Sequence, residues 1–174
     1  MLEGQQPQPV APWQQQPQPA SPWQQQPPAA GPSLPSDRMA AALTAADLRA
    51  HGLEPELEQT AVGVEDEGDG VGVYCGWTRA SGAQGGIELD LWSVGDPATT
   101  FATILANQTG EMRPAGLAGA DQSMIGLSVR SGFGPFATIA VARGGLVFTL
   151  AIPTGQHASD QLMGLASVVL ERLS

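Results

Sequence analysis

The chain has 174 residues and a formal net charge of −10, because 17 Asp and Glu residues outnumber seven Arg and no Lys. This balance argues against nucleic-acid binding, which needs a basic patch, and against adsorption to anionic lipid. The single cysteine excludes an internal disulfide and a cysteine-based metal cluster. No apolar run reaches the length of a membrane span, and no signal peptide is visible. The sequence as written predicts a cytoplasmic protein without direct membrane insertion; removal of a leader would instead place it in the extracytoplasmic cell envelope.

Residues 1–38 are rich in Pro and Gln and contain the hexapeptide PWQQQP twice, ten residues apart. Pro restricts its own φ and pushes the preceding residue toward extended conformations, so polyproline II and coil are favoured. The segment has too few aliphatic side chains to offset the entropy of ordering. We expect a disordered spacer ahead of one domain over residues 39–174. A second interpretation stays open, in which Trp13 and Trp23 are anchors that recruit a partner.

The first helix is predicted at about residues 44–51. Thr44 is the expected N-cap, Asp47 completes a variant of the capping box, and Gly52 is the expected left-handed C-cap. The strand segment LEQTAVGV follows, and the acidic run EDEGDG at residues 65–70 is expected to be an exposed turn.

The next two segments, VGVYCGWT and GGIELDLWSV, alternate apolar and polar residues with the period of a half-buried strand. The turn residues SGAQGG between them predict a hairpin. On the second segment Glu88, Asp90 and Trp92 point away from the aliphatic set. Two carboxylates beside an indole are able to line a ligand groove, so these three are the candidate ligand-binding residues. The alternative is that the long side chains simply cover the strand face, or that Trp92 packs under a helix.

The second half of the chain repeats this organisation. Asp96 as N-cap and Pro97 in the first turn predict a helix, and RPAGLAGAD is expected to be a loop. Three strand segments follow, MIGLSVR, PFATIAVAR and LVFTLAIP, of which the last two are joined by a Gly-Gly turn. A final amphipathic helix is expected at about 158–173. The order α-βββ-α-βββ-α predicts an α+β fold, an antiparallel sheet of about five to six strands flanked by three helices.

Catalytic and metal-binding patterns are weak throughout. His51 and His157 lie at helix ends, where they complement the helix dipole or its free N–H groups. Cys75 lies on the apolar face of a strand, as a buried small hydrophobe would. The EDEGDG run lacks the ligand spacing of a calcium-binding EF-hand, and no cofactor motif occurs. We therefore expect no metal and no cofactor.

Several segments occur in an order that resembles an actinobacterial family of cell-envelope lipoproteins: LTAADLRAHGL, VYCGWT, IELDLW, FATILANQTG and VARGGLVFTLAI. The resemblance covers residues 39–174 and implies a PsbP-like fold, an antiparallel sheet flanked by helices. The chain departs from the family in two ways. Alanines of RMAAALT replace a cysteine that often precedes the first helix, which leaves Cys75 unpaired, and the lipid-attachment cysteine is missing. An unpaired thiol is typical of a reducing compartment, so the two indications differ.

These observations favour a non-catalytic binding or interaction module displayed on a flexible spacer, with a protein or a small apolar ligand as its partner. One alternative is a hydrolase-like enzyme that uses carboxylates on the 86–94 strand, its acid/base pair lying among Glu88, Asp90 and the more distant Asp121. Another is an adaptor whose tail recruits a partner through Trp13 and Trp23.

Overall fold

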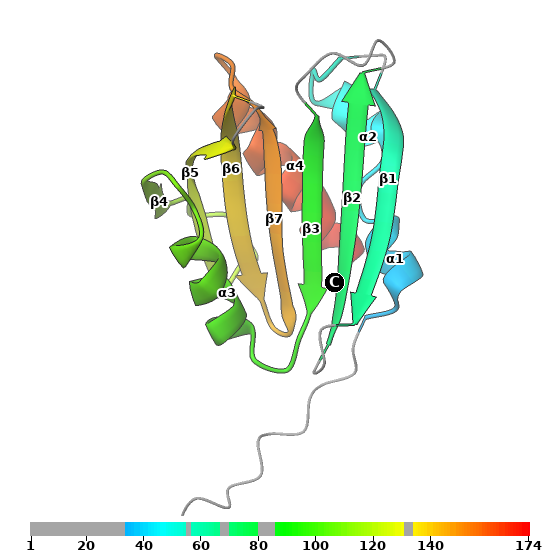
Figure 1. Ribbon diagram of the computed structural model, residues 1–174, viewed down its shortest axis with the longest axis vertical. Coiled ribbons are helices and arrows are strands. Elements are labelled where there is room, and N and C mark those ends of the chain that lie inside the picture. Colours follow the sequence, from blue (N-terminus) through cyan, green and yellow to red (C-terminus); the bar gives the residue numbers. More distant parts are fainter. Residues whose placement is uncertain (1–33, 55–56, 67–69, 80–85, 131–133) are drawn as a thin grey trace, which may run out of the picture.

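The computed structural model describes residues 34–54, 57–66, 70–79, 86–130 and 134–174. Within these ranges the strands are β1 (Leu57–Asp66), β2 (Val71–Arg79), β3 (Ile87–Ser93), β4 (Met112–Pro114), β5 (Gln122–Arg130), β6 (Gly134–Arg143) and β7 (Leu146–Pro153). The helices are α1 (Ser36–Ala40), α2 (Ala45–Ala50), α3 (Pro97–Ala106) and α4 (Ala158–Arg172). The strands form one antiparallel sheet in the order β1-β2-β3-β7-β6-β5-β4 (Figure 1). The α+β class with an antiparallel sheet is confirmed.

Two short elements go beyond the sequence prediction. The expected count of five to six strands is too low, because β4 adds a seventh strand beside β5 at the start of the expected loop. A strand of three residues carries too few positions to show a period of two. Helix α1 lies mostly within the segment assigned to the spacer. Leu34 packs against the core ahead of it, and its N–H donates to Ser93 Oγ at 3.0 Å.

The predicted start and stop residues act as expected. Thr44 and Asp47 form the complete capping box at the start of α2, and Gly52 follows the helix with a φ of 75°. The Asp96 side chain accepts the Thr99 N–H at 3.1 Å at the start of α3. Gly144 opens the tight turn between β6 and β7 with a φ of 54°. Left-handed φ values of this kind favour glycine because it has no Cβ.

The main core lies between the sheet and the layer formed by α1, α2 and α4. Alternate residues of the strands face this layer, as the alternation of VGVYCGWT and IELDLWS predicts. The strand residues at the centre of this core are Val73, Cys75, Trp77, Ile87, Leu89, Leu91, Ile139, Val141, Phe148 and Leu150. Helix α4 contributes Leu162, Leu165, Ala166, Val169 and Leu170. No helix in the described ranges is both long enough and apolar enough to cross a membrane.

The opposite face of the sheet is only partly covered. Phe101 of α3 packs there against Ala140, Ala142 and Val147, which belong to β6 and β7. Figure 1 shows α4 passing behind the sheet, while β1, β2 and β3 have no helix in front of them. We call this part of the sheet, on the side away from α4, the open face. The uneven helix cover leaves a polar strand surface available to a ligand.

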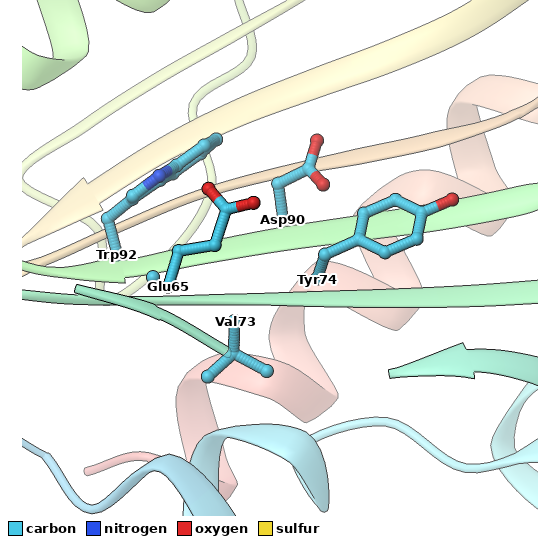
Figure 2. A pocket seen from close by; sticks show the side chains of 6 residues that line it. Glu65, Val73, Tyr74, Asp90 and Trp92 are labelled. Carbon is cyan, nitrogen blue, oxygen red and sulfur yellow. The ribbon is translucent and has the colours of Figure 1, made fainter. Parts of the chain in front are cut away.

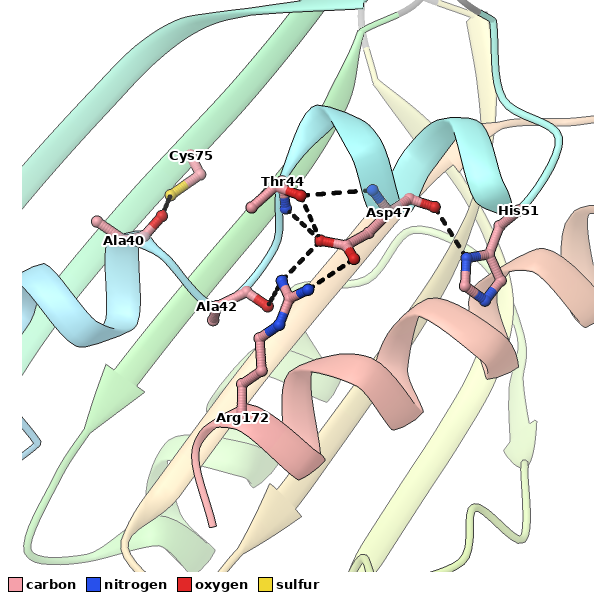
Figure 3. A network of polar contacts seen from close by, with 7 residues as sticks. All are labelled: Ala40, Ala42, Thr44, Asp47, His51, Cys75 and Arg172. Atoms are coloured by element: carbon pink, nitrogen blue, oxygen red, sulfur yellow. Dashed lines mark hydrogen bonds and ion pairs between the residues drawn. The ribbon is translucent and has the colours of Figure 1, made fainter.

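An ion pair joins α2 to α4 within the helix layer. Arg172, at the end of α4, donates to both carboxylate oxygens of Asp47, with Nη1–Oδ2 at 2.6 Å and Nη2–Oδ1 at 2.7 Å (Figure 3). Burial alone would raise the pKa of Asp47. Hydrogen bonds from Arg172 and Thr44 outweigh it and lower the pKa to about 2. Asp47, the second member of the capping box, therefore also joins α2 to α4.

Three sequence predictions concern segments outside the described residues. Trp13, Trp23 and both copies of PWQQQP belong to residues 1–33, and most of the SGAQGG turn belongs to 80–85. In the acidic run, residues 67–69 are also outside. Its first two residues, Glu65 and Asp66, are not in a turn, because β1 continues through Asp66 and pairs with β2 there.

Candidate functional site

The open face contains a pocket of about 280 Å³, to which β1, β2 and β3 contribute. It is lined by Glu65, Gly72, Val73, Tyr74, Asp90 and Trp92. The antiparallel register brings these residues together, because Gly72 lies between Glu65 on β1 and Trp92 on β3, and Tyr74 lies opposite Asp90. Directly opposed residues in neighbouring strands point to the same side of a sheet. Figure 2 shows the two carboxylates and the two aromatic rings on that shared side.

The two aromatic residues of the pocket, Tyr74 and Trp92, differ in what they pack against. Tyr74 is 38 % exposed, and its ring extends along β2 over Gly76, where an added Cβ would lie 3.0 Å from the phenol oxygen. Trp92 is half-buried and packs against the small cluster around Phe101 while it also lines the pocket. Trp92 therefore packs beside a helix and also forms a wall of the pocket.

Asp90 is the pocket carboxylate that receives a hydrogen bond from a neighbouring strand. Thr149 on β7 lies opposite it, and the Thr149 hydroxyl donates to Asp90 Oδ2 at 3.2 Å. Burial raises the pKa of Asp90; the bond from Thr149 lowers it, and the negative charge of Glu65 raises it further, with a net rise. The ionised form of Asp90 is therefore less favourable than it would be in water, and a neighbouring positive charge would stabilise it.

The structure separates the carboxylates proposed from the sequence. Asp90 and Trp92 line the pocket, whereas Glu88 lies on the same face but one row away, between Gly76 and Ala151 in the register, and does not line it. Asp121 is exposed and accepts the Gly144 N–H at 2.7 Å, so it supports the turn between β6 and β7. An acid–base group made of all three is not assembled.

Of the lining residues that sequence reasoning missed, two carry an acidic or aromatic side chain, Glu65 and Tyr74. Tyr74 could have been found, since it alternates with Val73 and Cys75 and must point to the other face. Glu65 could not, because it was assigned to a turn, and only the register of β1 against β2 brings it to Gly72.

The remaining reactive side chains lie elsewhere. Cys75 is fully buried under α1, its Sγ donates to the Ala40 carbonyl at 3.8 Å, and burial together with the charge of Asp90 raises its pKa. This environment keeps the thiol protonated. His51 Nδ1 donates to the Asp47 carbonyl at 2.9 Å, while His157 is exposed before α4. In the part of the chain that the structure describes, no group of three or more His, Cys, Asp or Glu side chains could hold a metal ion.

A second pocket of about 470 Å³ lies beside the first turn of α4. It is lined by Glu111, Arg113, Ile125, Gly126, Leu127, Ala137, Thr154, Gly155, Ala158 and Ser159. It has no aromatic wall, and its charged side chains have opposite signs. The pocket on the open face is thus the one with a consistent chemical character, acidic and aromatic.

Comparisons with known proteins add no relative. The chain matches no protein-family model. No curated protein is significantly similar to it. No solved structure is either. Function must therefore be argued from the geometry of the site.

Proposed function

We propose that the protein is a non-catalytic binding module whose open face takes a cationic group, an ammonium or a guanidinium, between Glu65, Tyr74, Asp90 and Trp92. One observation carries the proposal: two carboxylates and two aromatic side chains meet in a single pocket on the face that α4 does not cover. Carboxylates form charge-assisted hydrogen bonds with such donors, and aromatic ring faces attract cations.

The size of the pocket restricts the ligand. Its volume of about 280 Å³ lies near the lower limit of ligand pockets, which span roughly 300–1,000 Å³. This space suits one side chain or a small amine and is too small for a nucleotide cofactor. The alkyl stem of an arginine or lysine would lie along the rings of Tyr74 and Trp92, which keeps the apolar contact expected from the sequence.

Charge supports the same ligand class. The net charge of −10 attracts cations toward the molecule, and a bound cation would offset the unfavourable ionisation of Asp90. Binding and deprotonation of Asp90 are therefore linked, and affinity should rise as pH increases through the pKa of this carboxyl.

The hydrolase alternative rests on the raised pKa of Asp90 beside Glu65, since general acids have such values. It requires that Asp90→Asn abolish turnover of an ester, glycoside or peptide. The cell-envelope resemblance and the compartment stay predictions from the sequence.

The binding proposal is tested by calorimetric titration with N-acetyl-arginine methylamide, using the neutral N-acetyl-citrulline methylamide as a matched ligand. We expect the arginine compound alone to bind, with about tenfold weaker affinity after Asp90→Asn and a smaller loss after the more exposed Glu65→Gln. Glu111→Gln, at the second pocket, is the control and should bind as the unchanged protein does. Equal binding of both ligands, or full affinity in Asp90→Asn, would contradict the proposal.

A further inference from the structure

The N-terminal segment joins the domain at the end of β3, on the helix-covered side of the sheet, opposite the acidic and aromatic pocket. Leu34, the first described residue, packs against the core, and its N–H donates to Ser93 Oγ at 3.0 Å. Ser93 is the last residue of β3 and directly follows Trp92, which lines the pocket. The described chain therefore begins, at Leu34, near the end of the strand that carries Trp92 and Asp90 but on its other face.

The chain outside the described residues is long enough to return to the pocket. Trp23 precedes Leu34 by 11 residues, which span up to ~34 Å at the polyproline II rise of about 3.1 Å per residue. The path to the pocket passes round the end of the sheet and then along β3 from Ser93 to Asp90, three residues or about 10 Å. The nearer PWQQQP copy can thus reach the open face with chain to spare, and the farther copy, with Trp13, can also do so.

The chemistry of the repeat matches that of the pocket. Proline-rich segments bind aromatic-lined grooves, because their extended conformation is already formed and little entropy is lost. Tyr74 and Trp92 provide the aromatic surface, while Glu65 and Asp90 can accept hydrogen bonds from glutamine amides and indole N–H groups. Residues 1–33 contain one acidic residue, Glu3, so the repeat itself brings no charge repulsion to the acidic face.

We propose that the PWQQQP repeat of residues 12–27 docks on the open face of its own domain, in the pocket of Glu65, Tyr74, Asp90 and Trp92, and competes there with an external ligand. The docking stands without the proposed function; the competition alone rests on it. A covalent tether gives an effective concentration of about 1 mM, so a weak site with a Kd of ~1 mM would be half occupied. The repeat would then act as a tethered competitor, and its second copy would raise the occupancy further.

The docking is tested by amide and indole NMR spectra of the full chain and of its Trp13→Ala/Trp23→Ala variant. We expect the amides of Gly72 and Gly76, in the middle of β2, to shift between the two proteins, whereas Gly144 and Gly155 serve as controls and stay unchanged. Reciprocally, Tyr74→Ala should shift the indole signals of Trp13 and Trp23. Identical domain spectra would overturn the proposal, and shifts that vanish on dilution would overturn docking within one chain in favour of contact between copies.

A titration with N-acetyl-arginine methylamide separates this proposal from the proposed function. If both are right, the double Trp variant binds the compound about twofold tighter than the unchanged chain. Amide shifts without binding of the compound in either protein would support docking and contradict cation recognition. Equal binding by both proteins without amide shifts would support cation recognition and overturn docking.

Discussion

The two faces of the sheet are made by alternate residues of the same strands, but only one is closed. On β3, Leu89 and Leu91 are fully buried beneath the helix layer, whereas Asp90 and Trp92, between and beside them, line a pocket. Helices α1, α2 and α4 close the first face, and α3 covers the second only above β6 and β7. The strand pattern thus assigns each side chain to a face, and the helices decide whether that face becomes core or a binding surface.

The side of the sheet away from α4 also differs along its width. Under α3 its residues are small and apolar, namely Ala140, Ala142 and Val147. Across β1 to β3 the same face carries Glu65 and Asp90 with two aromatic rings. A helix buries the part that water would otherwise contact unfavourably and leaves the polar part accessible.

The largest expected effect comes from matched leucine substitutions on the closed face. Leu150 is fully buried, while Leu127 points to the same side of the sheet near its edge and is 56 % exposed. Leu150→Ala should lower the free energy of unfolding by about 3–4 kcal/mol, because it leaves a cavity. Leu127→Ala should lower it by less than ~1 kcal/mol. Urea unfolding measures both, and equal losses would show that the helix layer is not what closes this face.

A smaller effect is expected at the rim of the helix layer, where Arg172 holds Asp47. The folded-state pKa of Asp47 is lowered to about 2 from 3.8, so its contribution is present above pH 3.8 and is lost as pH falls toward about 2. Arg172→Ala should lower the free energy of unfolding at pH 7 by ~1–2 kcal/mol, since the pair is partly exposed.

Unfolding measured between pH 6 and pH 2 checks the origin of that loss. The difference between the Arg172→Ala protein and the unchanged one should shrink across this acid range. A difference that stays constant would show that Arg172 acts through packing and not through the charge of Asp47.

The smallest effect on stability, with the opposite sign, is expected on the open face. The pKa of Asp90 is raised in the folded protein, so its favourable contribution is complete below the unfolded-state pKa and is lost as pH rises through the folded-state pKa. Asp90→Asn should therefore stabilise the fold at neutral pH by less than ~1 kcal/mol while it weakens cation binding.

Thermal unfolding of the Asp90→Asn protein and of the unchanged protein, at pH 3 and at pH 7, checks this prediction. The gain should be present at pH 7 and absent at pH 3, where the carboxyl is protonated in both states. Destabilisation at pH 7 would mean that Asp90 is a structural residue of the sheet and not a residue kept for binding.

The sequence by itself determined the parts of this protein that depend on local physical chemistry. The N-caps Thr44 and Asp96 bond backbone groups a few residues away, and Gly144 adopts the left-handed conformation of its own turn. Such local features can be predicted from the neighbouring residues alone. The alternation of β3 likewise placed Asp90 and Trp92 on the correct face, because the period of a strand is a local property.

Only the tertiary structure decided which of these side chains meet. The addition of β4 to the edge of the sheet, the separation of Asp121 from Asp90, and the arrival of Glu65 beside Trp92 all depend on register between distant segments. Register is set by the packing of a whole face against its helices, which no single segment encodes. The acidic and aromatic pocket therefore became visible only when three strands were aligned and the extent of the helix layer was known.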